Sequence, residues 1–143
     1  MTGRLDTLLK SVRYRHSIDG ETNICIACRK TFPIKELQCG HFIKRGNLKL
    51  KYCDCNLAPE CVRCNKYLDG AQDKMAYHII KERGIDTFNW LIETDYKWSN
   101  GEMPKSLSKK EIAAAYNYWL TYTRQVEQKY GKTLIPKSWQ PFY

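Results

Sequence analysis

The chain has 143 residues, 43% of them hydrophobic and 27% charged, which is typical of one globular domain and excludes a disordered chain. It contains no apolar run near the roughly 20 residues that span a bilayer, and its first residues do not resemble a signal peptide, so we expect neither a membrane protein nor a secreted one. The net charge of +9 predicts a polyanionic partner, because residues 1–51 carry eleven Lys and Arg against four Asp and Glu.

The first predicted element is a helix within residues 1–20. Apolar residues recur there at the spacing of one helical face: Leu5, Leu8, Leu9 and Val12. The basic residues of this segment lie mostly off that face, where they contact either phosphate or only solvent. We therefore expect a basic helix ahead of the main fold.

Residues 22–70 are predicted to contain the strands. Residues 38–43 and 48–55 are the two strand candidates, and a turn joins them. A helix is expected to begin near Cys61 and to carry Asn65. The local prediction is a β-hairpin followed by a helix.

Residues 71–143 are predicted to be a helical extension with an aromatic tail. Helices are expected over residues 71–83 and 87–95. Gly84 is the expected C-cap of the first helix, and Asp86 the expected N-cap of the second. With the two preceding segments, this makes one domain over residues 1–143.

A longer helix is expected over residues 108–130. Ser108 and Glu111 form a capping-box pattern at its start, and Gly131 follows its end. Its apolar face is predicted to lie in the core: Ile112, Tyr116, Trp119, Leu120, Thr123 and Val126. The aromatic tail after Pro136 docks either on the body or on a second chain, and the helix is a candidate homodimer interface.

Four of the seven cysteines form two CxxC pairs, the pattern of a zinc site: Cys25, Cys28, Cys61 and Cys64. An odd number of cysteines without an export signal favours reduced thiols over a disulfide framework. Four thiolates close a tetrahedron and leave no open position. We therefore expect this Zn²⁺ to be structural, and its binding free energy to contribute to folding.

The other three cysteines allow two interpretations. In a strand, Cys53 and Cys55 point to one face, and with Cys39 on the paired strand they would form a thiol cluster or a second soft-metal site. Free cysteines are also common as small buried apolar residues.

His41 and Asn65 are the candidate catalytic residues. An imidazole and an amide next to a metal are the groups that metal-assisted phosphodiester cleavage requires. His41 lies between the two CxxC pairs and Asn65 directly follows the second. Taken alone, each has an ordinary interpretation, as a surface histidine and a capping asparagine.

The order of these motifs resembles the NinG/Rap proteins of lambdoid phages, which are similar to HNH (ββα-metal) nucleases of branched recombination intermediates. The resemblance covers about residues 22–125. The same order of motifs resembles, more distantly, the phage resolvase endonuclease VII. The residues that carry it are Cys25-x-x-Cys28, Gly40-His41-Phe42-Ile43-x-Arg45-Gly46, Leu50-x-Tyr52, Asn56 and Cys61-x-x-Cys64-Asn65-x-x-Leu68-x-Gly70.

The resemblance implies an α+β fold with a zinc-stapled ββα-metal core, an N-terminal helix and a C-terminal helical extension. By it, His41 is the general base, Asn56 holds the loop that orients the base, and Asn65 binds Mg²⁺ or Mn²⁺. Arg45 is the candidate phosphate clamp, and Asp69 is a weaker candidate metal ligand. The expected products carry a 5′-phosphate and a 3′-hydroxyl.

One position departs from many HNH enzymes. They carry Asp or His directly before the base as a second metal ligand, whereas this chain has Gly40, as NinG-like proteins do. One Asn and several waters suffice for Mg²⁺ in a site of this kind. Asp54 and His78 are further candidate ligands that the sequence leaves open.

We therefore expect a phage- or prophage-encoded endonuclease that acts in the cytoplasm of the bacterial host on branched or single-stranded DNA. The first alternative is a non-catalytic zinc module that binds nucleic acid and needs no hard divalent ion. The second is a site-specific HNH endonuclease, for which little chain remains to read a DNA sequence.

Overall fold

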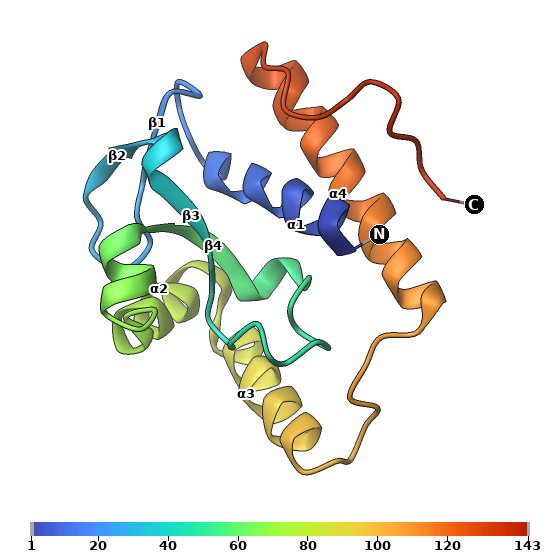
Figure 1. Ribbon diagram of the computed structural model, residues 1–143. Coiled ribbons are helices and arrows are strands. Elements are labelled where there is room, and N and C mark those ends of the chain that lie inside the picture. Colours follow the sequence, from blue (N-terminus) through green and yellow to red (C-terminus); the bar gives the residue numbers. More distant parts are fainter. Residues whose placement is uncertain (1, 143) are drawn as a thin grey trace.

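The computed structural model describes residues 2–142 and consists of two small antiparallel sheets and four α-helices in that range (Figure 1). Helix α1 continues as a 3₁₀ turn, Lys10–Tyr14, and a single π-helical turn, Arg63–Tyr67, follows the last strand. The bounds are α1 Thr2–Leu9, β1 Thr22–Ile24, β2 Thr31–Pro33, β3 Leu37–His41, β4 Leu57–Cys61, α2 Gln72–Arg83, α3 Ile85–Ser99 and α4 Lys109–Tyr130.

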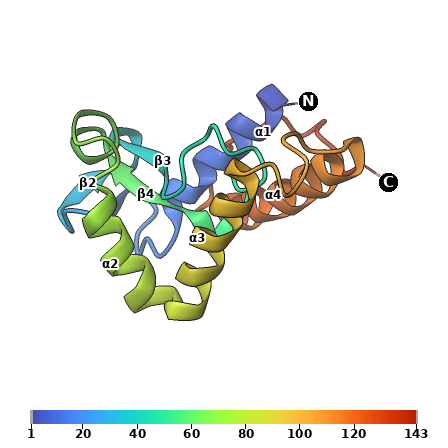
Figure 2. The same cartoon turned by 90° about the horizontal axis from the view of Figure 1, so that it is seen from below.

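The β3–β4 ribbon lies between two helix pairs, with α1 and α4 on one side and α2 and α3 on the other (Figure 2). Its antiparallel register runs from Leu37 opposite Cys61 to His41 opposite Leu57. Neighbouring residues of a strand point to opposite faces, so Leu57 packs into the α1–α4 core while Ala58 packs into the α2–α3 core. The ribbon is thus covered on both faces.

The prediction of a second strand at residues 48–55 is wrong, because β4 begins only at Leu57. Residues 44–56 form a compact loop that the side chain of Asn56 holds from within. Its Nδ2 donates to the carbonyls of Ile43 at 3.0 Å and Leu50 at 3.1 Å, and its Oδ1 accepts from the Ile43 N–H at 2.7 Å. These tertiary hydrogen bonds satisfy backbone groups that a strand would otherwise pair.

The long helix is confirmed as α4, and it packs along α1. Ser108 and Glu111 make both hydrogen bonds of the capping box, and Gly131 ends the helix at φ 66°. Trp119 is fully buried and donates from Nε1 to the Tyr52 carbonyl at 2.9 Å. The predicted apolar face is therefore core.

Helices α2 and α3 meet at Gly84, whose φ of 93° ends α2 as predicted. The prediction that Asp86 caps α3 is wrong. Helix α3 begins at Ile85, directly after Gly84, and Asp86 lies in its first turn, where a carboxylate favours the positive end of the helix dipole. Within residues 2–142, no helix combines the length and apolar character needed to cross a membrane.

The aromatic tail docks on the body of its own chain. The Phe142 ring lies 4.8 Å from that of Tyr116, and the guanidinium of Arg4 lies 4.7 Å above Trp139. The tail thereby covers the outer side of the α1–α4 pair.

Candidate active site and metal centre

The two CxxC pairs come together as the sequence predicted. The Sγ atoms of the four residues all lie within 4.8 Å of one another: Cys25, Cys28, Cys61 and Cys64. Cys28 and Cys61, from different pairs, approach to 4.0 Å. The cluster joins the β1–β2 turn to the end of β4.

This donor set fits one tetrahedral zinc ion. Zn–S bonds of about 2.3 Å separate the sulfurs of a tetrahedron by about 3.8 Å, close to the observed Cys28–Cys61 distance. The backbone N–H of Cys64 points to the sulfur of Cys61 at 3.5 Å, a contact that stabilises a thiolate. The cluster therefore indicates a structural zinc, held by cysteines alone.

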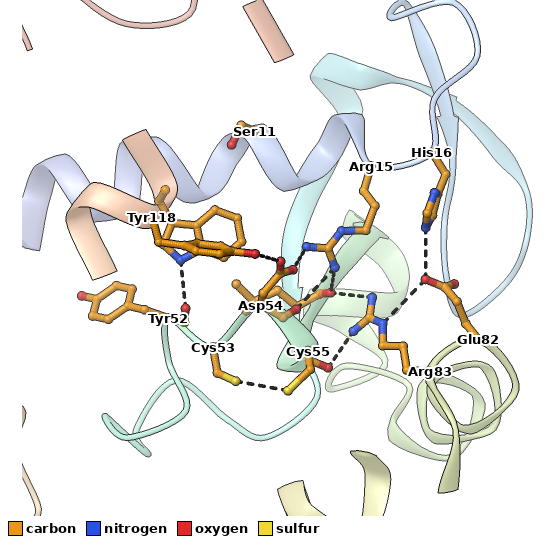
Figure 3. A network of polar contacts seen from close by, with 12 residues as sticks. Ser11, Arg15, His16, Tyr52, Cys53, Asp54, Cys55, Glu82, Arg83 and Tyr118 are labelled. Atoms are coloured by element: carbon orange, nitrogen blue, oxygen red, sulfur yellow. Dashed lines mark hydrogen bonds and ion pairs between the residues drawn. The ribbon is translucent and has the colours of Figure 1, made fainter. Parts of the chain in front are cut away.

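The other three cysteines do not form the three-thiol cluster that the sequence allowed. Cys53 and Cys55 lie side by side with 3.1 Å between their sulfurs (Figure 3), but Cys39 does not join them among the described residues. The reason is that residues 53–55 are not in a strand. Burial raises the pKa of the Cys39 thiol to about 12, so it is a neutral core group.

A basic hollow of about 790 Å³ runs along β3. Residues of α1, the 3₁₀ turn after it, the 44–56 loop and the π-helical turn form its walls, with His41 and Asn65 among them. Seven basic residues against two acidic ones give it a positive potential. The basic residues are Lys10, Arg13, Lys35, Lys44, Arg45, Lys51 and Lys66, and the acidic ones Asp6 and Glu36.

His41 stands at the end of β3 with one ring nitrogen engaged. Its Nε2 lies 3.0 Å from the Lys51 carbonyl. A carbonyl oxygen only accepts, so Nε2 carries the hydrogen and Nδ1 keeps its lone pair. Lys51 belongs to the loop that Asn56 holds together, so Asn56 indirectly positions the ring.

His41 is neutral over a wide pH range. Burial lowers its pKa to about 4, and the charges of Arg45 and Lys51 act in the same direction. The carbonyls of Lys51 and Cys39 oppose them. Only 9% of the residue is exposed, and burial keeps the imidazole in the unprotonated form that a general base requires.

Asn65 lies on the π-helical turn and faces β3. Its Nδ2 donates to Gln38 Oε1 at 2.7 Å, a bond that leaves its Oδ1 unused. Arg45 also lines the hollow. Asp69 does not line the hollow; it is exposed and accepts from Nζ of Lys44, a lining residue, through its Oδ1 and its backbone carbonyl, both at 2.8 Å.

Sequence reasoning missed Glu60, which lies in β4 one residue before Cys61. It is fully buried, and neither of its carboxylate oxygens has a hydrogen-bond partner among the described residues. Burial raises its pKa to about 7. The available signal was a single charged residue inside an otherwise uncharged run that leads into a cysteine pair.

A second charged group, the Asp54 cluster of Arg15, Asp54, Arg83 and Tyr118, lies beside β4 (Figure 3). The Asp54 carboxylate accepts hydrogen bonds from Arg15 and from the Tyr118 hydroxyl. Arg15 and Arg83 also donate to the Leu57 carbonyl, at 2.6 and 2.8 Å. Asp54 is thus engaged in an ion pair away from the hollow. His78 is partly buried on α2, outside the hollow, with its ring 5.0 Å from that of Tyr77.

Comparison with known proteins gives one finding. A family model described as bacteriophage lambda NinG protein matches residues 7–127, which include every cysteine, His41 and Asn65. Searches of curated proteins and of solved structures found no significant match.

Proposed function

This chain belongs to the bacteriophage lambda NinG family, and from that premise we propose that it is a metal-dependent DNA endonuclease. The observation that carries the proposal is that His41, with an Nδ1 lone pair not used in a side-chain hydrogen bond, lines a hollow rich in lysine and arginine. His41 and Asn65 both line the basic hollow, and among the described residues neither His41 Nδ1 nor Asn65 Oδ1 is a partner in a side-chain hydrogen bond. A phosphodiester would be drawn to the lysines and arginines there.

The local architecture supports an HNH-type core. The β3–β4 hairpin ends in a helical turn, with His41 on the first strand, Asn56 on the loop and Asn65 on the turn. The four-cysteine zinc ties the hairpin to the β1–β2 unit and so keeps the turn against β3. This is the order of parts that the resemblance to ββα-metal nucleases implies.

The proposed reaction is hydrolysis by an activated water. Nδ1 of His41 takes a proton from the water as its oxygen bonds to phosphorus, and the bond from phosphorus to the 3′ oxygen breaks. The products carry a 5′-phosphate and, once the leaving oxygen takes up a proton, a 3′-hydroxyl. Asn65 would hold Mg²⁺ or Mn²⁺, which when bound offsets the negative charge on the phosphate and the departing oxygen. Arg45 lies nearby to bind a phosphate oxygen.

The proposed substrate is branched or single-stranded DNA. Lysines and arginines are the charged residues that dominate the walls of the hollow, and the contacts that such groups make with phosphate carry no sequence information. This favours recognition of backbone shape over a site-specific endonuclease. A phage enzyme of this kind would act in the host cytoplasm, where its seven free cysteines stay reduced.

The test is cleavage of labelled four-way junction, fork, single-stranded and linear duplex DNA by the zinc-loaded protein, with Mg²⁺, Mn²⁺ or EDTA. We expect His41→Ala to lower the rate roughly 10²–10⁴-fold, the usual contribution of a general base. The matched control is His78→Ala, which removes a partly exposed histidine of α2 outside the hollow and should cut like wild type.

The outcomes separate the alternatives. Metal-dependent cutting that His41→Ala abolishes supports the nuclease, and the order of substrates then separates a structure-selective enzyme from a general one. Uncut DNA in every lane, with tight binding to the branched forms, would contradict the proposal and favour a zinc module that only binds nucleic acid. Equal cutting by His41→Ala would remove His41 from the mechanism.

A further inference from the structure

Glu60 is the one described residue whose buried side-chain atoms lack any hydrogen-bond partner. It is fully buried, and both oxygens of its carboxylate are affected. Burying a carboxylate is costly unless hydrogen bonds or an opposite charge offset the loss of water. An orphan group of this kind inside a folded chain indicates an absent ligand more than a structural role.

The Glu60 side chain lies directly against Gly40. A Cβ placed on Gly40 would come within 2.6 Å of Glu60 Oε1 and 2.9 Å of Glu60 Cβ. The φ of this glycine is not in the left-handed region, so its function is to leave space rather than to permit a turn. Gly40, the residue before His41, therefore leaves the space that the Glu60 carboxylate occupies.

The same face of the ribbon leads from Glu60 to Asn65. Gln38 is the cross-strand partner of Glu60 in the antiparallel register, so both side chains point to one face. Gln38 in turn accepts a hydrogen bond from Asn65 at 2.7 Å. Glu60, Gln38 and Asn65 are three neighbouring oxygen-bearing side chains that come from β4, β3 and the π-helical turn.

The nearby charges do not neutralise Glu60. Lys44 is the cation that most favours its ionised form, but Lys44 Nζ is bonded to the exposed Asp69. Among the described residues, the Glu60 carboxylate therefore forms no ion pair and accepts no hydrogen bond.

We propose that Glu60 and Asn65 are ligands of one hard divalent cation, Mg²⁺ or Mn²⁺, bound between β3–β4 and the π-helical turn. Such ions take oxygen ligands and keep several waters, so one carboxylate and one amide are a sufficient protein contribution. The inference rests on the proposed function for its role in cleavage, but the binding of the ion is independent of it. Gly40 is required because any larger residue would displace the carboxylate.

The test measures Mn²⁺ binding to the zinc-loaded full chain, with the electron paramagnetic resonance signal of free Mn²⁺ as the readout. We expect one site in wild type, and at least a 10-fold weaker dissociation constant in Glu60→Gln and in Asn65→Ala. The matched control is Glu36→Gln, which makes the same charge change at an exposed residue of the same hollow and should shift binding less than 2-fold. Zinc content and circular dichroism check that each variant is folded.

A second variant tests the space over Gly40 while both ligands are retained. Gly40→Ala should weaken Mn²⁺ binding at least 10-fold, because its methyl group takes the place of the carboxylate. If Glu60→Gln and Gly40→Ala, both folded, bind Mn²⁺ like wild type, the inference is overturned and the carboxylate is bridged by water or by a rotated Lys44.

Cleavage separates this inference from the proposed function. If Glu60 is needed for Mn²⁺ binding but no DNA is cut, the metal site stands and the nuclease does not. If DNA is cut in a metal-dependent manner and Glu60→Gln both binds Mn²⁺ and cuts like wild type, the nuclease stands and Glu60 is not a ligand.

Discussion

Two groups of charged residues border the β3–β4 ribbon, and they differ in how completely their charges are paired. In the Asp54 cluster, each charge has partners: Asp54 accepts from Arg15 and Tyr118, and both arginines also donate to backbone carbonyls (Figure 3). On the other side, His41 Nδ1 and both carboxylate oxygens of Glu60 have no side-chain hydrogen-bond partner among the described residues.

The difference indicates which cluster is structural and which binds a ligand. A paired and hydrogen-bonded cluster offers no group to a ligand, and it fixes the position of β4 and of the 3₁₀ turn that precedes it, Asp54–Asn56. Unpaired buried groups lower stability and persist where a bound molecule or ion satisfies them. Charge alone does not separate the two, because both clusters contain arginine or lysine beside a carboxylate.

The largest expected effect comes from the zinc site at the end of β4, the strand that both groups border. Its four cysteines connect the β1–β2 turn to the end of β4, and structural zinc contributes on the order of 10 kcal/mol to small domains. We expect Cys64→Ser to abolish cooperative thermal unfolding. The measurement is a thermal melt by circular dichroism with zinc content from the same sample. Cys39→Ser, outside the cluster, should keep its zinc, and a folded Cys64→Ser would contradict a structural metal.

The next largest effect is the change in the free energy of unfolding when a carboxylate in each group is replaced by its amide. Asp54→Asn should destabilise the protein by about 2 kcal/mol, because it leaves the largely buried Arg15 without its counter-charge. Glu60→Gln should stabilise it by about 1 kcal/mol in the absence of a divalent ion, because it removes an unpaired buried charge.

Urea unfolding of zinc-loaded protein in a buffer free of Mg²⁺ and Mn²⁺ measures both free energies. Opposite signs would support the division into a structural cluster and a ligand-binding one. A loss of stability in Glu60→Gln equal to that in Asp54→Asn would mean that Glu60 is also a structural residue, and the comparison would fail.

The zinc site and the long helix were predictable because their signals are local. A CxxC pair fixes two ligands within four residues, and the spacing of Ser108 and Glu111 marks a helix start. The order of His41 and Asn65 along the chain was enough to place both near one hollow. Their roles in cleavage stay predictions.

Strand β4 was missed because it lacks the pattern that identifies a strand. Both faces of the ribbon are covered, so all five residues from Leu57 to Cys61 are buried and no alternation of polar and apolar residues appears. Pro59 further weakens the strand signal. The apparent strand at residues 48–55 was a loop whose conformation depends on the Asn56 amide.

The two charged clusters could not be predicted, because each depends on tertiary contacts. Arg15 and Asp54 are 39 positions apart in the chain, and no local rule pairs them. Glu60 lies opposite Gln38 and against Gly40 only once β3 and β4 are in register. A register shift of one residue would place it on the other face.

The smallest expected effect is a pH dependence of stability that His41 causes. Its pKa in the folded protein is about 4, below the ordinary value of 6.5 that it has when unfolded. As the pH falls through 6.5, the unfolded chain takes up a proton that the folded protein does not, so stability decreases. The decrease continues to about pH 4, below which both states are protonated.

Lowering the pH from 7.5 to 5.5 should therefore cost wild type about 1 kcal/mol more than His41→Gln. The glutamine can still donate to the Lys51 carbonyl but does not titrate, and the contributions of His16, His78 and the cysteines cancel in the difference. Urea unfolding at the two pH values measures it. Equal losses in both proteins would mean that the imidazole is solvated or paired with an acid. Such an imidazole would be protonated, and so lost as a base, near pH 6.5, whereas a buried one would stay unprotonated to about pH 5. A larger loss in wild type would instead show that a buried, unprotonated imidazole lowers the stability of the fold at acidic pH. The hollow would then differ in this respect from the fully paired Asp54 cluster.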